Sequence, residues 1–182
     1  MQTFLFLAQG FEEIEAVAVI DILRRGALNV TTVSVTGNPV VVGAHNIAVT
    51  ADVVFENADF SSGKLLILPG GMPGADNLNA HPGLKTLLKQ YYADGKYLAA
   101  ICAAPLVLGD LQLLQGKKAV VYPGYEEHLT GATILTEPVV VDGHIITGRG
   151  PGFVFEFALS ILSVLLGQSQ ADAVAKGMLI DN

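Results

Sequence analysis

The sequence contains a single cysteine, Cys102, in the stretch YLAAICAAPLVLGD (97–110). An apolar run with strand character ends at this residue, and a run of alanines and leucines begins. A strand-to-helix turn presents its side chain at the rim of a sheet, as in a nucleophile elbow. The start of a helix favours a thiolate, by about 0.3–1 kcal/mol. We therefore expect a nucleophile if a second group assists it; the alternative is an inert, buried cysteine.

Glu15 is the candidate for that second group. In GFEEIEAVAVIDIL (10–23), one stripe of a predicted helix contains Phe11, Glu15, Val19 and Ile22. A charged carboxylate on an apolar stripe is costly unless it is paired, faces a cleft or is protonated. Burial raises the pKa of a glutamate, so Glu15 could act as a general acid or base near neutral pH. A solvated helix face fits Glu12 and Glu13 better.

Two further motifs contain glycines at the ends of predicted strands. In ILPGGMPGA (67–75), Gly70 and Gly71 would let a ligand or oxyanion approach backbone N–H groups. The alternative is an ordinary turn that needs glycine. The motif GRGPGFVFEF (148–157) is typical of a loop with Pro151 opening a helix.

The elements that position these residues alternate between strands and helices. Continuous apolar runs, which suit strands covered on both faces, predict strands at 3–8, 29–35, 64–71, 96–101, 117–122 and 138–148. Helical spacing predicts helices at 9–26, 81–95, 102–114, 152–167 and 169–178, and the segment 36–60 suggests a hairpin. This order predicts an α/β fold: a mostly parallel central sheet with helices on both faces. Such sheets place their sites at the carboxyl ends of strands, where three segments meet: Gln9-Gly10, Pro69-Gly70-Gly71 and Ile101-Cys102.

Composition narrows the class of protein. With 182 residues, 51% of them hydrophobic and 15% charged, we expect one globular domain over 1–182. No apolar run of about 18 residues and no secretory signal is found, and one cysteine excludes an internal disulfide, so the expected location is cytoplasmic. The net charge of −7 disfavours nucleic acid as a partner. The four histidines have no metal-ligand spacing, so we expect no metal and no cofactor.

Four motifs in this order, AQGFEEIEAV (8–17), LPGGMPGA (68–75), AICAAP (100–105) and GRGPGFVFEFA (148–158), resemble the ThiJ/PfpI superfamily, most closely its DJ-one branch. The resemblance covers essentially the whole chain. It implies a flavodoxin-like three-layer sandwich and a homodimer. It also implies specific site residues: Cys102 as the reactive cysteine, Glu15 as the carboxyl bonded to it, Gly70 with Gly71 as the glycine pair, N–H groups of Gly71 and Ala103 as oxyanion donors, Pro151 against the pocket, and Arg24 or Arg25 reaching into the partner subunit's site.

The sequence also departs from this family. Peptidase-like members have a histidine directly after the nucleophile, where this chain has Ala103, which argues against amidase chemistry. Members of the DJ-one branch often have a rim histidine some twenty residues past the cysteine. Counting back from RGPG places that position near Gly131 or Ala132, so His128 is the candidate for the pocket; its alternative is an exposed loop histidine. His45 falls where an arginine is common, and we expect it near the partner subunit.

Three functions follow from the resemblance. The first is a cofactor-independent glyoxalase or protein deglycase, in which Cys102 attacks methylglyoxal or its early adducts with proteins and thiols, and Glu15 moves the protons. The second is a non-enzymatic redox sensor or chaperone in which Cys102 is oxidised to sulfinate. The third, a cysteine amidase or peptidase, ranks last because of Ala103.

Overall fold

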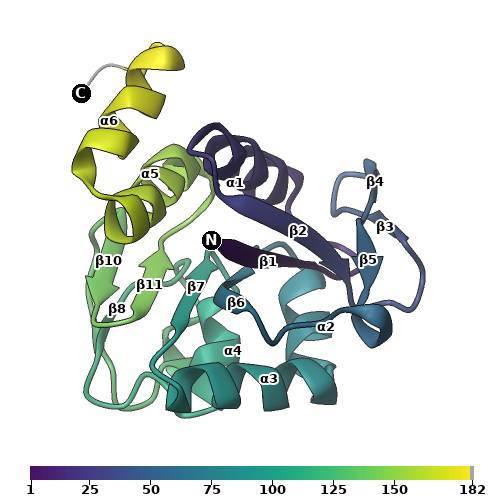
Figure 1. The fold of residues 1–182 in the computed structure, drawn as a ribbon. Coiled ribbons are helices and arrows are strands. Elements are labelled where there is room, and N and C mark those ends of the chain that lie inside the picture. The colour runs from purple at the N-terminus through teal and green to yellow at the C-terminus, as the bar shows by residue number, and fades with distance from the viewer. Residues whose placement is uncertain (181–182) are drawn as a thin grey trace.

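The computed structural model describes residues 1–180, and its centre is a seven-stranded sheet in the order β10-β11-β7-β6-β1-β2-β5 (Figure 1). Its strands are β1 (Gln2–Leu7), β2 (Asn29–Ser34), β5 (Val53–Val54), β6 (Gly63–Leu68), β7 (Tyr97–Ile101), β10 (Val139–Asp142) and β11 (Ile145–Gly148). All neighbouring strands are parallel except β10, which returns antiparallel to β11 through a tight turn. The predicted mostly parallel sheet is confirmed.

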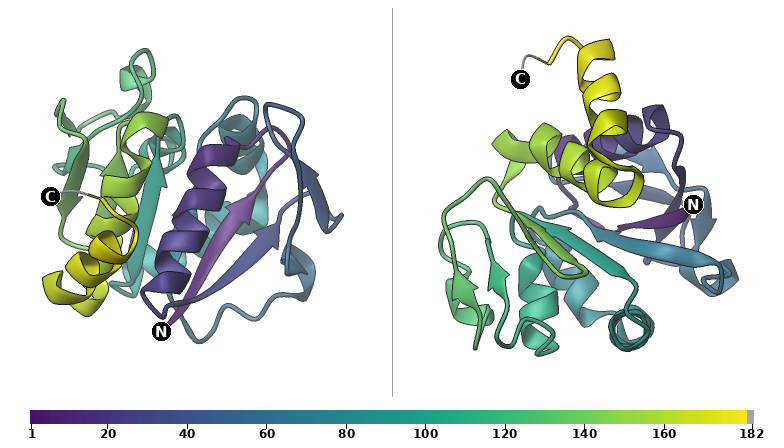
Figure 2. Two further views of the ribbon diagram at one scale, coloured as in Figure 1. Left: turned by 90° about the horizontal axis from the view of Figure 1, so that it is seen from above. Right: turned by 60° about the vertical axis from the view of Figure 1, so that its left-hand side comes forward.

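Helices cover both faces of this sheet (Figures 1 and 2). On one face lie α1 (Glu13–Arg25) and α5 (Val154–Leu166), with α6 (Gln168–Gly177) packed on α5. On the other face lie α2 (Gly74–Ala80), α3 (Pro82–Ala93) and α4 (Pro105–Asp110). The three-layer sandwich expected from the resemblance is therefore present. None of the helices within residues 1–180 is both long and apolar enough to cross a bilayer.

The remaining strands form two small sheets. The expected hairpin in 36–60 is β3 (Val40–Val42) paired antiparallel with β4 (Ala48–Thr50). The strand expected at 117–122 is shortened to β8 (Lys118–Ala119), which pairs with β9 (Thr133–Ile134) outside the main sheet. The rest of that segment does not form a ladder, because its N–H groups bond elsewhere: that of Val120 to the Thr147 hydroxyl and that of Tyr122 to the carbonyl of Cys102.

The helices also differ from the prediction in three ways. The first helix begins at Glu13 and not at residue 9, because Gln9–Glu12 form the turn that leaves β1. The helix predicted over 102–114 is only α4, since Cys102 and Gln112, which flank it, have positive φ angles of 63° and 61°. Helix α2 was not predicted, because its sequence GADNLNA is short and polar.

The central strands explain where the site forms. The side chains of β1, β6 and β7 are almost all buried, as their continuous apolar runs predict. These three strands are neighbours in the sheet, so the turns after their carboxyl ends meet at one edge. The predicted meeting of Gly10, Gly70 and Cys102 at that edge is confirmed: Gly10 accepts the N–H of Gly74, and Gly70 lies against Cys102.

Candidate functional site

Cys102 follows β7 directly and is 9% exposed. Its φ of 63° is in the left-handed region, which costs a non-glycine residue about 1–2 kcal/mol. Two backbone hydrogen bonds hold it there. Its N–H donates to the carbonyl of Gly148 at 2.9 Å, and its carbonyl accepts the N–H of Tyr122 at 2.9 Å. The chain on both sides of the cysteine is therefore fixed by neighbouring segments.

Glu15 reaches the same place from the first turn of α1. The stripe predicted from the sequence is fully buried in the structure: Phe11, Glu15, Val19 and Ile22. Glu15 Oε2 accepts the backbone N–H of Gly70 at 2.7 Å, whereas Oε1 is buried with no hydrogen-bond partner among the described residues. A Cβ atom on Gly70 would lie 2.8 Å from both Cys102 Cβ and Glu15 Oε2. Because Gly70 has no side chain, the carboxyl group of Glu15 and the thiol of Cys102 can approach each other.

The carboxyl and the thiol control each other's protonation. Burial raises the pKa of Glu15 to about 7, against the lowering effects of the Gly70 N–H and the Cys102 thiol. Burial, and then the charge of Glu15 and its hydrogen bond to the thiol, raises the pKa of Cys102 above that of an ordinary cysteine. The backbone N–H groups of the turn lower the pKa of the thiol, as the sequence predicts, but this effect is smaller than that of burial and of the Glu15 charge. The resting pair is a thiol beside a carboxyl group that is half ionised near pH 7.

Backbone N–H groups surround the sulfur. Those of Ala103 and Gly71 are directed at Cys102 and lower the pKa of its thiol. They stand where the resemblance places oxyanion donors. The N–H of Gly70, the other glycine of the pair, is used by Glu15 instead. The same turn therefore supplies one donor to the carboxyl group of Glu15 and one to the thiol of Cys102.

A groove of about 320 Å³ lies beside this site. It includes Pro151, which begins the short helical turn η3 (Pro151–Phe153), and Tyr122. Sequence reasoning missed Tyr122, although it stands twenty residues after Cys102, where the DJ-one branch often has its rim histidine. A forward count from the cysteine leads to Tyr122, whereas the backward count from RGPG leads to Gly131 or Ala132.

His128 lies elsewhere. Its Nδ1 is 3.0 Å from Asp110 Oδ1, at the carboxyl end of α4, whereas Cys102 precedes the amino end of that helix. It lines a separate hollow with Gly109 and Asp110. His128 is therefore neither a residue of the pocket beside Cys102 nor an exposed loop histidine: it is half-buried at the end of the short helical turn η2 (Glu126–His128), and Tyr122 lines the groove instead.

The two arginines near the end of α1 are half exposed and paired within their own chain. Arg25 Nε lies 2.7 Å from Asp21 Oδ2, and Arg24 Nη2 lies 3.1 Å from Asp52 Oδ2. Neither contact leads to Cys102 of the same chain. The expectation that one of them enters a partner subunit's site stays a prediction.

The other acidic residues of α1 belong to a different cluster. Glu13 is 6% exposed, so its expected place on a solvated face is wrong. Its Oε1 accepts the backbone N–H of His45 at 2.7 Å, and its Oε2 lies 2.9 Å from His45 Nδ1. Glu12 Oε2 is 3.7 Å from the same nitrogen. Among the described residues these three gather potential metal-ligand atoms within 4.8 Å, but both oxygens of Glu13 already hold the β3–β4 hairpin.

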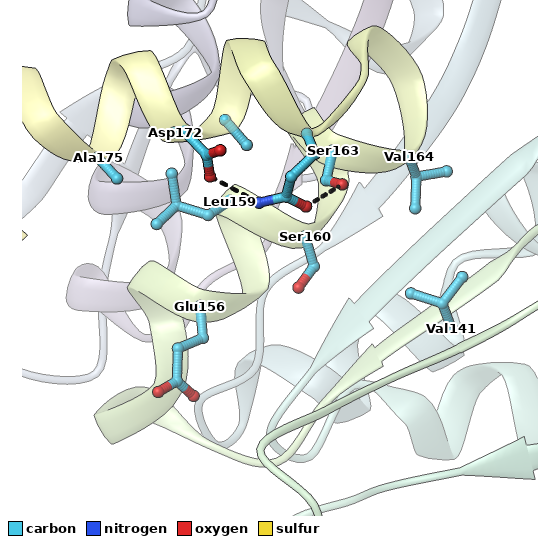
Figure 3. Close-up of a pocket in the computed structure, with 10 residues that line it drawn as sticks. Val141, Glu156, Leu159, Ser160, Ser163, Val164, Asp172 and Ala175 are labelled. Atoms are coloured by element: carbon cyan, nitrogen blue, oxygen red, sulfur yellow. Dashed lines mark hydrogen bonds between the residues drawn. The ribbon is translucent and has the colours of Figure 1, made fainter. Parts of the chain in front are cut away.

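Another hollow, of about 320 Å³, is lined by residues of α5, α6 and β10 (Figure 3). Its polar side chains bond to each other: Ser163 Oγ donates to Gln168 Oε1 at 2.8 Å, and Gln168 Nε2 donates to Asp172 Oδ1 at 2.7 Å. It contains no nucleophile with an adjacent base. Of the two hollows of about 320 Å³, the groove next to Cys102 is therefore the better candidate for a reactive site.

Comparison with known proteins supports the resemblance seen in the motifs. A model of the DJ-1/PfpI family matches residues 1–164. Protein DJ-1 homolog A of Arabidopsis thaliana is 41% identical over 177 residues, which are 96% of this chain but only 45% of that protein, so the chain spans about half of this relative. The glutathione-independent glyoxalase DJR-1.2 of Caenorhabditis elegans is 32% identical over 91% of this chain and 88% of its own. The solved structure of oxidized Toxoplasma gondii DJ-1 superposes with a TM-score of 0.96 at 36% identity, over 100% of this chain and 99% of that one.

Proposed function

Because the chain belongs to the DJ-1/PfpI family, we propose that it is a cofactor-independent glyoxalase that converts methylglyoxal, or its early adducts with amines and thiols on proteins, into lactate. The observation that carries the proposal is a buried carboxyl group, with its pKa raised to about 7, against the sole thiol of the chain. A general acid or base works best when its pKa is close to the working pH. A relative named as a glutathione-independent glyoxalase adds support.

The first step is the attack of Cys102 on the aldehyde carbon of the substrate. Ionised Glu15 accepts the thiol proton as the sulfur–carbon bond forms, which supplies the thiolate only when the substrate is present. The N–H groups of Gly71 and Ala103 stabilise the oxyanion that develops on the aldehyde oxygen. Glu15 then returns its proton to that oxygen, which gives a hemithioacetal.

The second step is an internal redox transfer that needs no cofactor. Glu15 removes the proton from the former aldehyde carbon, and the electron pair forms a double bond to the neighbouring carbon. Glu15 then passes this proton to the former ketone oxygen, which gives an enediol. Delivery of a proton to that neighbouring carbon and loss of the proton on the first oxygen produce a thioester. Water then cleaves the thioester, which releases lactate and restores the thiol. The balance is one methylglyoxal and one water for each lactate.

A redox sensor or chaperone is the second candidate function. The same N–H groups of Gly71 and Ala103, together with protonated Glu15, would bind the oxygens of a Cys102 sulfinate. Peroxide reacts with thiolates, however, and burial raises the pKa of this thiol. The glyoxalase mechanism avoids this difficulty because Glu15 takes the proton during the attack.

The test measures lactate produced from methylglyoxal by the native protein, Cys102→Ser and Glu15→Gln. We expect turnover by the native protein and background rates for both variants. Turnover that survives Cys102→Ser would eliminate the proposed nucleophile. An absence of turnover, with stoichiometric sulfinate at Cys102 after mild peroxide by mass spectrometry, would favour the sensor. Adding a pre-glycated peptide in a parallel reaction, after free methylglyoxal has been removed, separates action on adducts from action on the free aldehyde.

The proposal includes a homodimer in the cytoplasm. Two apolar side chains of α1 remain unusually exposed, Ile14 at 56% and Val17 at 48%, and they lie on one helix face. A second copy on this face would bring Arg25 toward the other site. Light scattering should therefore give twice the chain mass, and Val17→Arg should halve it. A monomer at micromolar concentration would contradict this part of the proposal. The free thiol fits a reducing compartment.

A further inference from the structure

We propose that the groove beside Cys102 binds the side group of the substrate, and that Tyr122 selects α-oxoaldehydes with an aryl group over methylglyoxal. This inference rests on the proposed function, because it names the substrate class of the same site. It depends on three features: the position of the groove relative to the thiol, its apolar lining and the exposed ring of Tyr122.

The groove is connected to the cysteine through the backbone on two sides. Gly148 pairs with Ile101 at the ends of β11 and β7, so Gly150 and Pro151 emerge beside Cys102 at the same edge of the sheet. On the other side, the N–H of Tyr122 donates to the carbonyl of Cys102. Both walls of the groove are therefore next to Cys102 along the backbone. On this basis we place the side group of a substrate bonded to that sulfur in the groove.

The lining of the groove is apolar with one charged residue. It is formed by Tyr122, Pro123, Arg149, Gly150, Pro151, Gly152 and Phe153. Arg149 is already engaged through Nη1, which donates to the carbonyl of Thr136 at 2.9 Å. Proline and aromatic walls attract a flat apolar group, because aromatic rings stabilise each other beyond the effect of the apolar area that they bury.

Tyr122 is the residue that gives this groove its preference for aryl groups. Tyr122 is 45% exposed, and Cδ2 of its ring lies close to Gly150, where a Cβ atom would be 3.2 Å away. Gly150 therefore borders one edge of the ring, and both residues line the groove. The methyl group of methylglyoxal is too small to contact both this ring and the opposite wall, whereas a phenyl group spans more of the space.

The first experiment compares kcat/KM for phenylglyoxal and for methylglyoxal in the native protein, Tyr122→Ala and Tyr122→Phe. We expect the native protein to prefer phenylglyoxal. In Tyr122→Ala the ratio should fall about tenfold, mainly through the KM of phenylglyoxal, which is the range expected for loss of one apolar contact surface. Tyr122→Phe should keep the ratio. The matched control is Tyr125→Ala, whose ring stacks on His128 outside the groove. An equal ratio in the native protein and Tyr122→Ala would overturn the inference.

A second measurement tests the groove without turnover. Intact-mass spectrometry follows the modification of Cys102 by N-phenylmaleimide and N-methylmaleimide, with glutathione as the reference thiol. We expect the protein to favour the phenyl reagent more than glutathione does, and Tyr122→Ala to lose this preference. If the ratio of the phenyl to the methyl reagent rate is the same for the protein and for glutathione, the inference of an aryl-binding groove is overturned. A phenyl preference without turnover of either aldehyde would overturn the glyoxalase function and leave the aryl-binding groove supported.

Discussion

The first turn of α1 has two buried glutamates, and their surroundings have opposite effects on them. Glu13 and Glu15 are 6% and 0% exposed, and they stand two residues apart. Burial acts to raise the pKa of Glu13, but hydrogen bonds from the His45 ring and from the backbone of Glu13, His45 and Ile47 hold it below its usual value. Burial raises the pKa of Glu15 to about 7, because the Gly70 N–H and the Cys102 thiol compensate for it only partly.

The difference shows that the depth of burial and the number of hydrogen-bond donors together decide what a carboxyl group in this turn does. Glu13 is surrounded by hydrogen-bond donors and stays charged, so it serves to hold the β3–β4 hairpin against α1. Glu15 leaves Oε1 without a partner among the described residues, so it can exchange a proton near neutral pH. One turn of helix thus contains a structural carboxylate and a candidate catalytic acid.

The largest effect should come from removing the ionisable group of Glu15, and the same change at Glu13 is the comparison. Glu15→Gln should lower kcat/KM for the α-oxoaldehyde by about 10²–10⁴-fold, because the proton transfers lose their acid and base. Glu13→Gln, which removes the charge of the neighbouring glutamate in the same turn, should change kcat/KM by less than about threefold. Steady-state lactate assays on both variants check this. If Glu13→Gln is as inactive as Glu15→Gln, the two glutamates do not have the different roles assigned to them here.

The second prediction uses the glycine next to each carboxyl group. A Cβ atom on Gly70 would meet Cys102 Cβ and Glu15 Oε2 at 2.8 Å, and one on Gly43 would overlap Glu13 Oε1. Gly70→Ala should cost about 1–3 kcal/mol of stability and most of the activity, since the carboxyl and the thiol are pushed apart. Gly43→Ala should reduce stability and leave the turnover of the folded protein nearly intact.

Urea denaturation and lactate assays on the same preparations separate these two outcomes. The control is Gly177→Ala in α6, where a Cβ atom would have no neighbour within 4 Å. Its stability should be equal to that of the native protein or slightly higher. Equal loss of activity in Gly70→Ala and Gly43→Ala would contradict the separate roles of the two carboxyl groups.

The third prediction concerns the stability cost of Glu15. Its folded pKa is raised above the usual 4.5 to about 7, so the unfolded state loses its proton first as the pH rises. The cost is therefore absent below pH 4.5, grows between pH 4.5 and 7, and then remains constant, on the order of 3 kcal/mol at about 1.4 kcal/mol per pKa unit. Glu15→Gln should gain stability relative to the native protein across that window in urea titrations at pH 4.5, 6 and 8. A constant difference would refute the shift.

The smallest effect should come from His45. Its hydrogen bond to Glu13 and the nearby charges of Glu12 and Glu13 raise its pKa, so its contribution to stability is complete below pH 6.5 and is lost as the pH rises through the higher folded value. The lowered pKa of Glu13 removes the same contact in acid, from pH 4.5 downward. His45→Gln should therefore lower Tm most between about pH 4.5 and 6.5, by about 2 °C or less. A difference that is larger at pH 9 than at pH 5.5 would contradict this assignment.

Sequence patterns predicted the centre of the site better than its surroundings. The apolar stripe containing Glu15, and the continuous runs that end at Gly70 and Cys102, are local patterns, and parallel strands must bring such ends to one edge. The contact between Glu13 and His45, which holds the β3–β4 hairpin against α1, was not predictable in this way. His45 lies 32 residues from Glu13, and neither residue is part of a periodic pattern. The place of Tyr122 depends on a hydrogen bond to Cys102 made by a segment that leaves the sheet, and propensity alone favours a continued strand there.

The left-handed backbone of Cys102 has a consequence for folding. Neighbouring strands impose this conformation on a residue that does not prefer it, so the molecule gives up some stability to keep a sulfur atom in this position. Cys102→Gly relieves the strain and Cys102→Ala retains it, although both delete the reactive atom. If the glycine form withstands more urea than the alanine form, then the candidate nucleophile occupies a position where the backbone conformation lowers the stability of the folded protein.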